Sequence, residues 1–294
     1  MRKSTIGCPL KLSSEPCNIV QRVGSVRDYR DVGILECLSC GVTFHAEDLT
    51  HIVDYVNGTM TFEEVNGSVT PMAPDEDDKR RGVFIRRNFP SKQKSKISVL
   101  DFGSGYGNLL KELEHDYEIE GLEIDAQARA KSQAEGFRVH DSLAAIKVKN
   151  QKYDLITMIH VVEHLTNPVE VLKQLSSLLR ENGSIVIETP NADDALLVSY
   201  NCLEFQNWTY WSHHPVLFNF KGIFNLVEKA QLKCILSEPV QRYNLANHMY
   251  WLSEGAPGGH VHWAGYFSDH LNNLYQAELF ERKQTDTIFV KVSS

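Results

Sequence analysis

The hydrophobic pattern of the chain changes near residue 97. Beyond it, short apolar runs alternate with segments whose apolar residues recur at helical spacing, which is typical of a parallel sheet with helices on both faces. Continuous apolar runs predict buried strands at Ile97–Phe102 and Tyr153–Ile159, and Pro168 begins an amphipathic helix that Asn182-Gly183 ends. We therefore expect residues 97–294 to form one doubly wound α/β domain. The other expected elements are strands at Glu118–Ile124, Phe137–His140, Ser184–Glu188, Lys233–Val240 and Thr287–Val292, and a helix at Lys221–Lys229.

The first 96 residues have a different pattern. Residues 1–70 contain short β-branched runs broken by Gly and Pro, which predict a small module of hairpins. Residues 71–96 begin with four acidic residues, Asp75 to Asp78, and continue with eight basic residues and no acid from Lys79 to Lys96. A charge run of this kind predicts a connector with a solvated helix face. The alternative is that Arg80, Arg81 or Arg86 contacts a substrate phosphate.

Composition narrows the class of protein. With 294 residues, 42% of them hydrophobic and 23% charged, the chain is an ordinary globular protein. Its net charge of −8 argues against a nucleic-acid partner and favours a small-molecule or glycan-precursor partner. The six cysteines are irregularly spaced, and the sequence shows no signal peptide and no 18-residue apolar stretch. We therefore expect a cytoplasmic protein that does not span a membrane, of undetermined oligomeric state.

A glycine-rich loop follows the first predicted strand of the large domain. Val99 to Gly107 reads VLDFGSGYG, with an acidic residue and three alternating glycines between strand and helix. Such glycines let the backbone approach a ligand closely and turn into the helix. Asn108 stands where a dinucleotide fingerprint needs its third glycine, which weakens a pyrophosphate assignment. Glu123, at the end of the next strand, can accept hydrogen bonds from a ribose diol, so one nucleoside is predicted.

Residues 97–240 resemble the class I S-adenosylmethionine-dependent methyltransferases. The resemblance lies in VLDFGSGYGNLL, GLEIDA, YDLITMIHVVEHLTNP and SIVIETPN. It implies a Rossmann-like seven-stranded sheet of order 3-2-1-4-5-7-6, with a small β-rich N-terminal module and a C-terminal lid insertion. It also implies that the methionine moiety, the ribose and the adenine of the cofactor lie along the loops after the first, second and third strands. The cofactor-binding residues expected on this basis are Asp101, Gly103, Ser104, Gly105, Tyr106, Glu123, Ile124, Asp141, Ser142, Leu143 and His160.

The region after the fifth strand has an unusual composition. All four Trp and six of the twelve His lie between residues 208 and 270. Flat aromatic faces beside imidazoles suit a sugar or another polyhydroxyl acceptor, although the same aromatics could form the core of an insertion. Methyl transfer to a hydroxyl needs a base, and His213 and His214 are the candidates. Residues 191–220 and 241–284 are expected to form the lid, with a flexible turn at Pro257-Gly258-Gly259.

His160, Glu163 and His164 form an H-x-x-E-H motif after the fourth strand. Ubiquinone-pathway and small-RNA methyltransferases carry E-x-x-E-H and a later His that hold a divalent cation. In this chain His160 replaces a hard oxygen ligand with nitrogen, which disfavours magnesium. We therefore expect Glu163 and His164 to brace the pocket wall, and we take His160 as a third candidate catalytic residue.

The N-terminal cysteines suggest a second kind of site. Cys37-Leu38-Ser39-Cys40-Gly41 has the form of one zinc knuckle, and Cys8 with either Cys17 or His45 could complete four ligands. This arrangement resembles the zinc-binding segment that precedes the methyltransferase domain in sugar-modifying enzymes of bacterial surface-polysaccharide and antibiotic pathways. A metal-free relic is the alternative. A redox C-x-x-C is disfavoured because no βαβ unit surrounds it.

Together these features predict a methyltransferase that methylates a hydroxyl of a sugar nucleotide or a surface-glycan precursor of the O-antigen or capsule type. A sugar C-methyltransferase and a quinone or phenol O-methyltransferase remain alternatives, because fold does not determine the acceptor. A non-catalytic scaffold is disfavoured by the intact loop from Asp101 to Gly107, and a nucleic-acid methyltransferase by the net charge.

Overall fold

A seven-stranded sheet forms the centre of the protein. The computed structural model describes residues 7–10, 16–49, 74–90, 96–148 and 150–294, so the expected hairpins between 50 and 70 lie outside the described residues. The strand order is β10-β11-β8-β7-β4-β5-β6, with only β11 antiparallel to its neighbours. This confirms the expected order 3-2-1-4-5-7-6. The strands are β4 (Ser98–Phe102), β5 (Glu118–Leu122), β6 (Val139–His140), β7 (Tyr153–Ile159), β8 (Leu179–Pro190), β10 (Lys233–Val240) and β11 (Thr287–Ser293).

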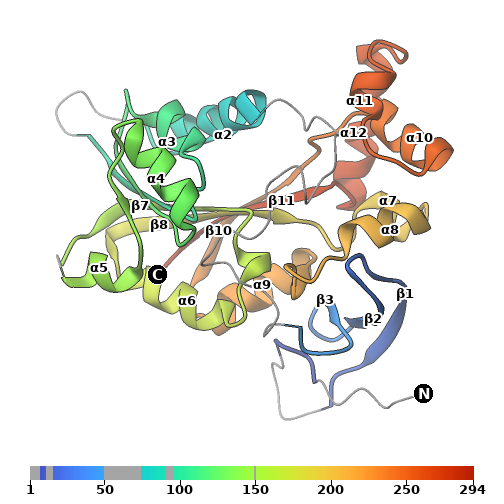
Figure 1. Ribbon diagram of the computed structural model, residues 1–294, viewed down its shortest axis with the longest axis horizontal. Helices are drawn as coiled ribbons and strands as arrows, with labels where there is room; N and C mark the ends of the chain where they lie inside the picture. Colours follow the sequence, from blue (N-terminus) through green and yellow to red (C-terminus); the bar gives the residue numbers. More distant parts are fainter. Residues whose placement is uncertain (1–6, 11–15, 50–73, 91–95, 149) are drawn as a thin grey trace.

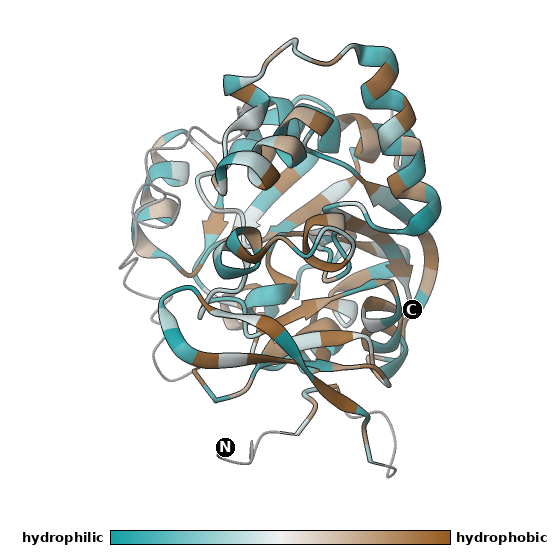
Figure 2. Ribbon diagram, turned by 90° about the vertical axis from the view of Figure 1, so that its right-hand side faces the viewer, coloured by the Kyte–Doolittle hydropathy of each residue, from teal (hydrophilic) through white to brown (hydrophobic). Residues whose placement is uncertain are grey.

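Six helices cover the two faces of this sheet. Figure 1 shows α2, α3 and α4 on one face and α5, α6 and α9 on the other. Figure 2 shows brown, hydrophobic segments in the strands inside the molecule, where side chains face the helices on both sides. The helices are α2 (Pro74–Asn88), α3 (Asn108–Leu113), α4 (Ala126–Ala134), α5 (Leu143–Val148), α6 (Pro168–Ser176) and α9 (Phe220–Lys229).

The segment after α6 differs from its prediction. Asn182-Gly183 does not end the helix, which stops at Ser176, but lies inside β8. The pairing of β8 with β7 shifts between Tyr153 and Leu155, and Asn182 has a φ of 63°. The Asn-Gly pair therefore marks a bulge in the strand, which the left-handed conformation of Asn182 permits.

The predicted charged connector contains helix α2, and its charged face is buried. Asp77, Asp78 and Arg81 are all less than a tenth exposed, and Phe84 and Ile85 pack into the core beneath them. Arg80 and Arg81 form ion pairs with Glu188 of β8 at 2.9 and 2.7 Å. The prediction of a solvated helix face is therefore wrong, because acidic and basic side chains of this helix pair with charges inside the protein.

A second, four-stranded sheet joins the N-terminal segment to the large domain. It contains β1 (Ile19–Val26), β2 (Tyr29–Cys37), β3 (Val42–His45) and β9 (Val216–Phe218), in this order. Since β9 comes from the segment after β8, the small sheet includes a strand from each part of the chain. Phe44 of β3 and Phe218 of β9 belong to the same apolar cluster as the large sheet.

Further helices stand beside the carboxyl ends of the large sheet. Trp251 packs against Phe205 and Trp208 at ring-centroid distances of 5.1 and 5.9 Å, which fixes α10 on α8. In the described part of the chain, no helix combines the length and the apolar character needed to cross a bilayer. These elements are η1 (Val162–His164), α7 (Ala195–Val198), α8 (Leu203–Thr209), α10 (Leu245–Glu254), α11 (Gly259–His262) and α12 (Asp269–Arg282).

Candidate functional site

The acidic residues expected to bind cofactor lie at the carboxyl ends of β4 and β5. Asp101 is buried and its carboxylate accepts a hydrogen bond of 2.6 Å from the Thr157 hydroxyl. The Glu123 carboxylate accepts from the backbone N–H groups of Gly105 and Asp125, both at 2.8 Å. These bonds fix the orientation of the carboxylate and join the glycine loop to the end of β5.

The glycine loop has one closed and one open side. Gly103 has a φ of 81°, and a Cβ at this position would lie 2.4 Å from a methyl carbon of Val161. Gly105 has a φ of 52°, and a Cβ there would meet nothing within 4 Å. Only glycine tolerates the first position, while the space at the second can admit a ligand.

The remaining predicted cofactor residues lie along the same edge. The N–H of Glu123 donates to the carbonyl of His140 at 2.9 Å, so the segment after β6 runs beside the segment after β5. Tyr106 and Ile124 are 47% and 44% exposed. The structure thus brings the predicted set together at one edge: Asp101, Gly103, Ser104, Gly105, Tyr106, Glu123, Ile124, Asp141, Ser142 and Leu143.

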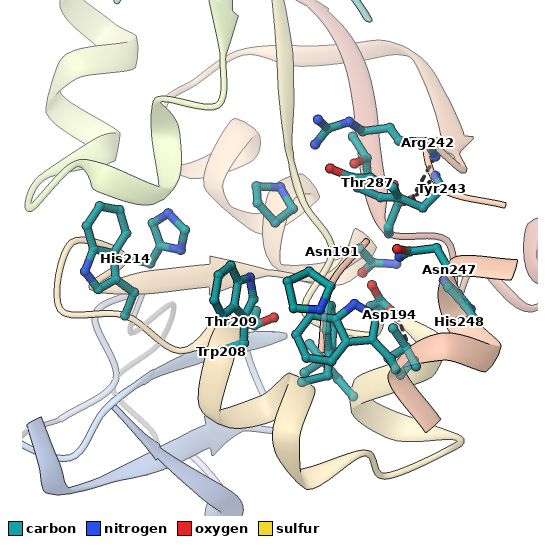
Figure 3. A pocket seen from close by; sticks show the side chains of 18 of the residues that line it. Asn191, Asp194, Trp208, Thr209, His214, Arg242, Tyr243, Asn247, His248 and Thr287 are labelled. Carbon is teal, nitrogen blue, oxygen red and sulfur yellow. Dashed lines mark hydrogen bonds between the residues drawn. The ribbon is translucent and has the colours of Figure 1, made fainter. Parts of the chain in front are cut away.

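A pocket of about 590 Å³ opens where β7, β8 and the helices around α8 and α10 meet. Figure 3 shows Trp208 and Thr209 in its middle, His214 to one side, and Asp194, Asn247 and His248 to the other. Three of the four Trp line it, as do His160, His164, His214, His248 and His260, whereas Trp263 and His213 do not. Its other lining residues are Arg27, Glu163, Pro190, Asn191, Leu196, Leu197, Phe205, Arg242, Tyr243, Pro257, Gly258, Asp286 and Thr287.

One end of this pocket is rich in buried polar groups. Burial, and the nearby charge of Asp286, raise the pKa of Asp194 well above its ordinary value. Burial also lowers the pKa of His248 to about 4, so its imidazole is neutral near pH 7. His248 bonds to the Tyr275 hydroxyl at 2.7 Å. Uncharged donors and acceptors of this kind suit the hydroxyl groups of a ligand.

His160 lies between two buried carboxylates. Its Nδ1 is 3.3 Å from Glu163 and its Nε2 is 3.2 Å from Glu188. Burial alone would lower the pKa of His160, but the bonds to these carboxylates outweigh it and raise the pKa. The Nε2 also lies 3.3 Å from a guanidinium nitrogen of Arg242, so both ring nitrogens of His160 face charged groups of the protein.

Glu163, His164 and His214 converge on one point of the pocket. Their ligand atoms all lie within 4.8 Å of one another. The Nδ1 of His164 donates to the carbonyl of His213 at 2.8 Å, and the buried Nδ1 of His214 has no hydrogen-bond partner among the described residues. Two imidazoles and a carboxylate are a donor set for Zn²⁺ or another divalent transition metal. These three residues therefore fit a divalent transition-metal ion, and His160 is not among the convergent ligand atoms.

The two candidate bases have different surroundings. Burial and the neighbouring His164 lower the pKa of His214 to about 3, and its ring lies edge-on to His164 with centroids 4.7 Å apart. The ring of His213 instead stacks on Trp211 at 4.1 Å, outside the pocket lining. His213 contributes its carbonyl, which orients His164. Of the two candidate bases, only His214 directs its imidazole into the pocket.

The four N-terminal cysteines form a cluster. The Sγ atoms of Cys8, Cys17, Cys37 and Cys40 all lie within 4.8 Å of one another. The N–H of Cys40 points to the Cys37 sulfur at 3.3 Å, and Gly41 turns the chain with a φ of 75°. Burial raises the pKa of the Cys17 thiol to about 11 in the absence of a metal. Four convergent thiols fit a tetrahedral zinc ion, with Cys17 rather than His45 as the fourth member.

Several residues of the site were not predicted. Arg27 of the N-terminal hairpin lines the pocket, and no sequence motif connects it with residues beyond 200. Glu188 lies within SIVIETPN, but an isolated acid in an apolar strand gave no indication of its partners. Asp194 and Arg242 lie just after predicted strands, at the edge where ligands of α/β folds bind, and this position is a signal that could have found them.

Comparison with known proteins identifies the family. A family model described as a methyltransferase domain matches residues 78–237, more than half of the chain. The ubiquinone biosynthesis O-methyltransferase of Glaesserella parasuis serovar 5 (strain SH0165) is 27% identical over 128 residues, 39% of this chain. The match spans 50% of the length of that curated relative.

Solved structures show the same fold. The CcbJ methyltransferase from Streptomyces caelestis aligns with a TM-score of 0.50 and 10% identity, over 82% of this chain and 99% of that one. A SAM-dependent methyltransferase from Archaeoglobus fulgidus aligns with a TM-score of 0.47 and 17% identity, over 74% and 94% of the two chains.

The sheet order and the glycine loop define a class I Rossmann-like methyltransferase fold. The chain belongs to the methyltransferase-domain family.

Proposed function

We propose that this enzyme transfers the methyl group of S-adenosylmethionine to a hydroxyl of a sugar nucleotide or surface-glycan precursor. The observation that carries the proposal is the 590 Å³ pocket beside the glycine-loop edge, whose walls combine Trp208, Trp211 and Trp251 with buried polar side chains. Aromatic faces cover the apolar face of a sugar ring, and neutral polar groups bind its hydroxyls.

The cofactor would lie along the edge formed by the ends of β4, β5 and β6. Asp101 and the loop at Gly103 and Gly105 would hold its methionine moiety, and Glu123 its ribose hydroxyls. Asp141 to Leu143 would border the adenine. The two backbone N–H groups that orient the Glu123 carboxylate support this assignment, because each oxygen retains a lone pair for a ribose hydroxyl.

His214 is proposed to remove the acceptor's proton. In an in-line displacement at a methyl group, the attacking hydroxyl becomes an oxonium as the C–O bond forms and the C–S bond breaks. An oxonium is a strong acid, so a neutral imidazole of low pKa can accept its proton. The Glu163 carboxylate then stabilises the resulting imidazolium. Glu163, His164 and His214 are also the residues that would hold a divalent cation. With such an ion bound, His214 would serve as a ligand instead of the base, and the ion would lower the pKa of a hydroxyl bound to it.

We further propose that Cys8, Cys17, Cys37 and Cys40 bind one structural zinc ion. The support is the convergence of four sulfur atoms at the start of the small sheet, with an N–H donor on the Cys37 sulfur. Zinc would displace the thiol protons and bind the four sulfur atoms. It would thereby link the chain before β1 to the turn between β2 and β3.

The proposed function is tested in two steps on the full chain. Calorimetry with S-adenosylhomocysteine should show binding that weakens at least tenfold in Glu123→Gln, since two ribose hydrogen bonds to a charged group are lost. Glu118→Gln, on the exposed start of β5, is the matched control and should bind as the wild type does. Loss in neither variant would contradict the cofactor assignment.

Methyl transfer is then measured against sugar nucleotides, with phenols and quinols as competing acceptors. In His214→Asn we expect kcat to fall roughly 10²- to 10⁴-fold with unchanged cofactor affinity, as for loss of a general base. His213→Ala keeps the carbonyl that orients His164 and should lose much less. Turnover confined to phenols or quinols would exclude the sugar assignment, and an unchanged kcat in His214→Asn would exclude the base.

A further inference from the structure

Arg27 is held rigidly at the tip of the β1–β2 hairpin. Its backbone N–H donates to the carbonyl of Tyr210 at 2.7 Å. The neighbouring Asp28 carboxylate accepts from the backbone N–H of Ser212 at 3.0 Å and from its hydroxyl. The turn is therefore fixed on both sides of Trp211, although these residues come from opposite parts of the sequence.

The Arg27 side chain enters the pocket between two tryptophans. Its guanidinium carbon lies 4.8 Å from the ring centroid of Trp208 and 5.1 Å from that of Trp211. Aromatic faces of this kind hold a guanidinium in place by cation–π attraction and leave the N–H groups at its edge available. As far as the described residues show, the side chain is thus positioned without the use of its hydrogen-bond donors.

Among the described residues, no carboxylate forms an ion pair with Arg27. The other pocket arginine, Arg242, pairs with Asp77 at 2.6 Å, and Arg22 of the same hairpin pairs with Glu36 at 2.8 Å. Asp28 attracts Arg27 through space, but its two oxygens are bonded to Ser212. Burial lowers the pKa of Arg27 from its ordinary value. Within the part of the chain that the structure describes, this partly buried cation lacks the anion that would compensate its lost hydration.

We propose that Arg27 binds an anionic group of the methyl acceptor, a phosphate or a carboxylate attached to the sugar. This inference rests on the proposed function, because it assigns the pocket to the acceptor. The planar guanidinium presents paired N–H donors that match either anion. The N-terminal hairpin thereby selects charged acceptors for a reaction that the large domain performs.

The position of Trp211 relates this anion site to the chemistry. One face of its ring supports Arg27, and its ring lies edge-on to His214 and His164 at centroid distances of 5.3 and 6.3 Å. An acceptor bound to Arg27 would therefore place its reacting hydroxyl about one aromatic ring away from its charged group. This geometry favours a sugar whose anion lies on or next to the ring that is methylated.

Binding of three matched sugars to the full chain, saturated with S-adenosylhomocysteine, tests the proposal. Glucose 1-phosphate, glucuronate and glucose supply a phosphate, a carboxylate and no charge on similar rings. Tryptophan fluorescence reports binding directly, since Arg27 lies over Trp208 and Trp211. We expect one or both anions to bind, glucose to bind much more weakly, and Arg27→Met to weaken the anion roughly ten- to hundredfold.

Arg30→Met is the matched control, because Arg30 is exposed on the next strand of the same hairpin and its loss changes the net charge equally. It should leave all affinities unchanged, and Arg27→Lys should restore part of the lost affinity. Preference for glucose 1-phosphate or for glucuronate identifies the anion. Affinities for all three sugars within twofold of one another, or an Arg27→Met variant that binds the anion as the wild type does, would overturn the proposal. Cofactor affinity, measured on the same samples, shows separately whether the methyltransferase site itself has failed.

Discussion

At the scale of single residues, burial changes the charge of Asp101, the residue proposed to bind the methionine moiety of the cofactor. Burial raises the pKa of its carboxyl to about 7, even though the Thr157 hydroxyl bond acts in the opposite direction. Near neutral pH the carboxyl is therefore partly protonated. The α-ammonium of a bound cofactor would favour the carboxylate, so binding should release a proton at and below pH 7.

The titration of Asp101 should change ligand affinity and protein stability in opposite directions as the pH rises. Affinity for S-adenosylhomocysteine should rise with pH, by up to tenfold per unit below about pH 7, and become constant above it. The stability of the ligand-free protein should change in the other direction. Between about pH 4 and 7, the Asp101 carboxyl keeps its proton in the folded protein but loses it in the unfolded chain. The contribution of this group to the free energy of unfolding therefore falls as the pH rises.

Calorimetry at pH 5.5, 6.5, 7.5 and 8.5 measures the affinity. Asp101→Asn should bind more weakly and should lose this dependence. A wild-type affinity that is flat between pH 5.5 and 7.5 would contradict the role given to Asp101.

At the scale of elements, helix α2 is anchored by buried charges rather than by hydrophobic contacts alone. Glu188 of β8 is fully buried and bonds to Arg80, Arg81 and His160. Removing one member of a buried ion pair leaves its partners without compensation, which typically destabilises a protein by about 3–5 kcal/mol. We therefore expect Glu188→Ala to lower the free energy of unfolding by about this amount.

A second ion pair on α2 supplies the control. Arg87 and Glu238 also join this helix to the sheet, at 2.9 Å, but the Arg87 side chain is 62% exposed. Exposed pairs contribute about 0–1 kcal/mol, so Glu238→Ala should have little effect. Urea denaturation of both variants measures the difference. If both variants lost the same free energy of unfolding, burial would not determine how much the network around Glu188 stabilises the protein.

These elements also show what sequence reasoning could and could not reach. Strands such as β7 were predictable because a continuous apolar run between helices has few other structures available. The network around Glu188 was not predictable, because Arg80 and Arg81 lie more than 100 positions before Glu188 and a charge run does not indicate its partners. The cofactor edge was predicted from local loops. The polar end of the pocket instead combines residues from distant segments, such as Asp194 and Asn247.

At the scale of the whole molecule, the small sheet forms part of the pocket wall. Strand β9 pairs with β3 through Val216 and Phe218, and the β1–β2 turn bonds to Tyr210 and Ser212. The Trp208 and Trp211 side chains thus lie between the N-terminal hairpin and the large domain. Among the described residues, no strand pairing or hydrogen bond joins the small sheet to the cofactor edge at β4 to β6, so a change in the small sheet should affect the acceptor site more than the cofactor site.

Removal of zinc tests this separation. The proposed ligands Cys37 and Cys40 lie between β2 and β3, so Cys37→Ser with Cys40→Ser, or treatment with a strong chelator, should loosen the sheet that carries Arg27. We expect freshly purified wild-type protein to contain one equivalent of zinc. Its loss should lower the thermal midpoint and weaken acceptor binding, while S-adenosylhomocysteine binds within about twofold of the wild type. Cys234→Ser, which replaces an exposed cysteine outside the cluster, is the control and should change none of these values.

Two outcomes would contradict this prediction. Metal analysis that finds no zinc would exclude the metal. Equal losses of acceptor binding and cofactor binding would show that the small sheet stabilises the whole domain rather than the acceptor wall.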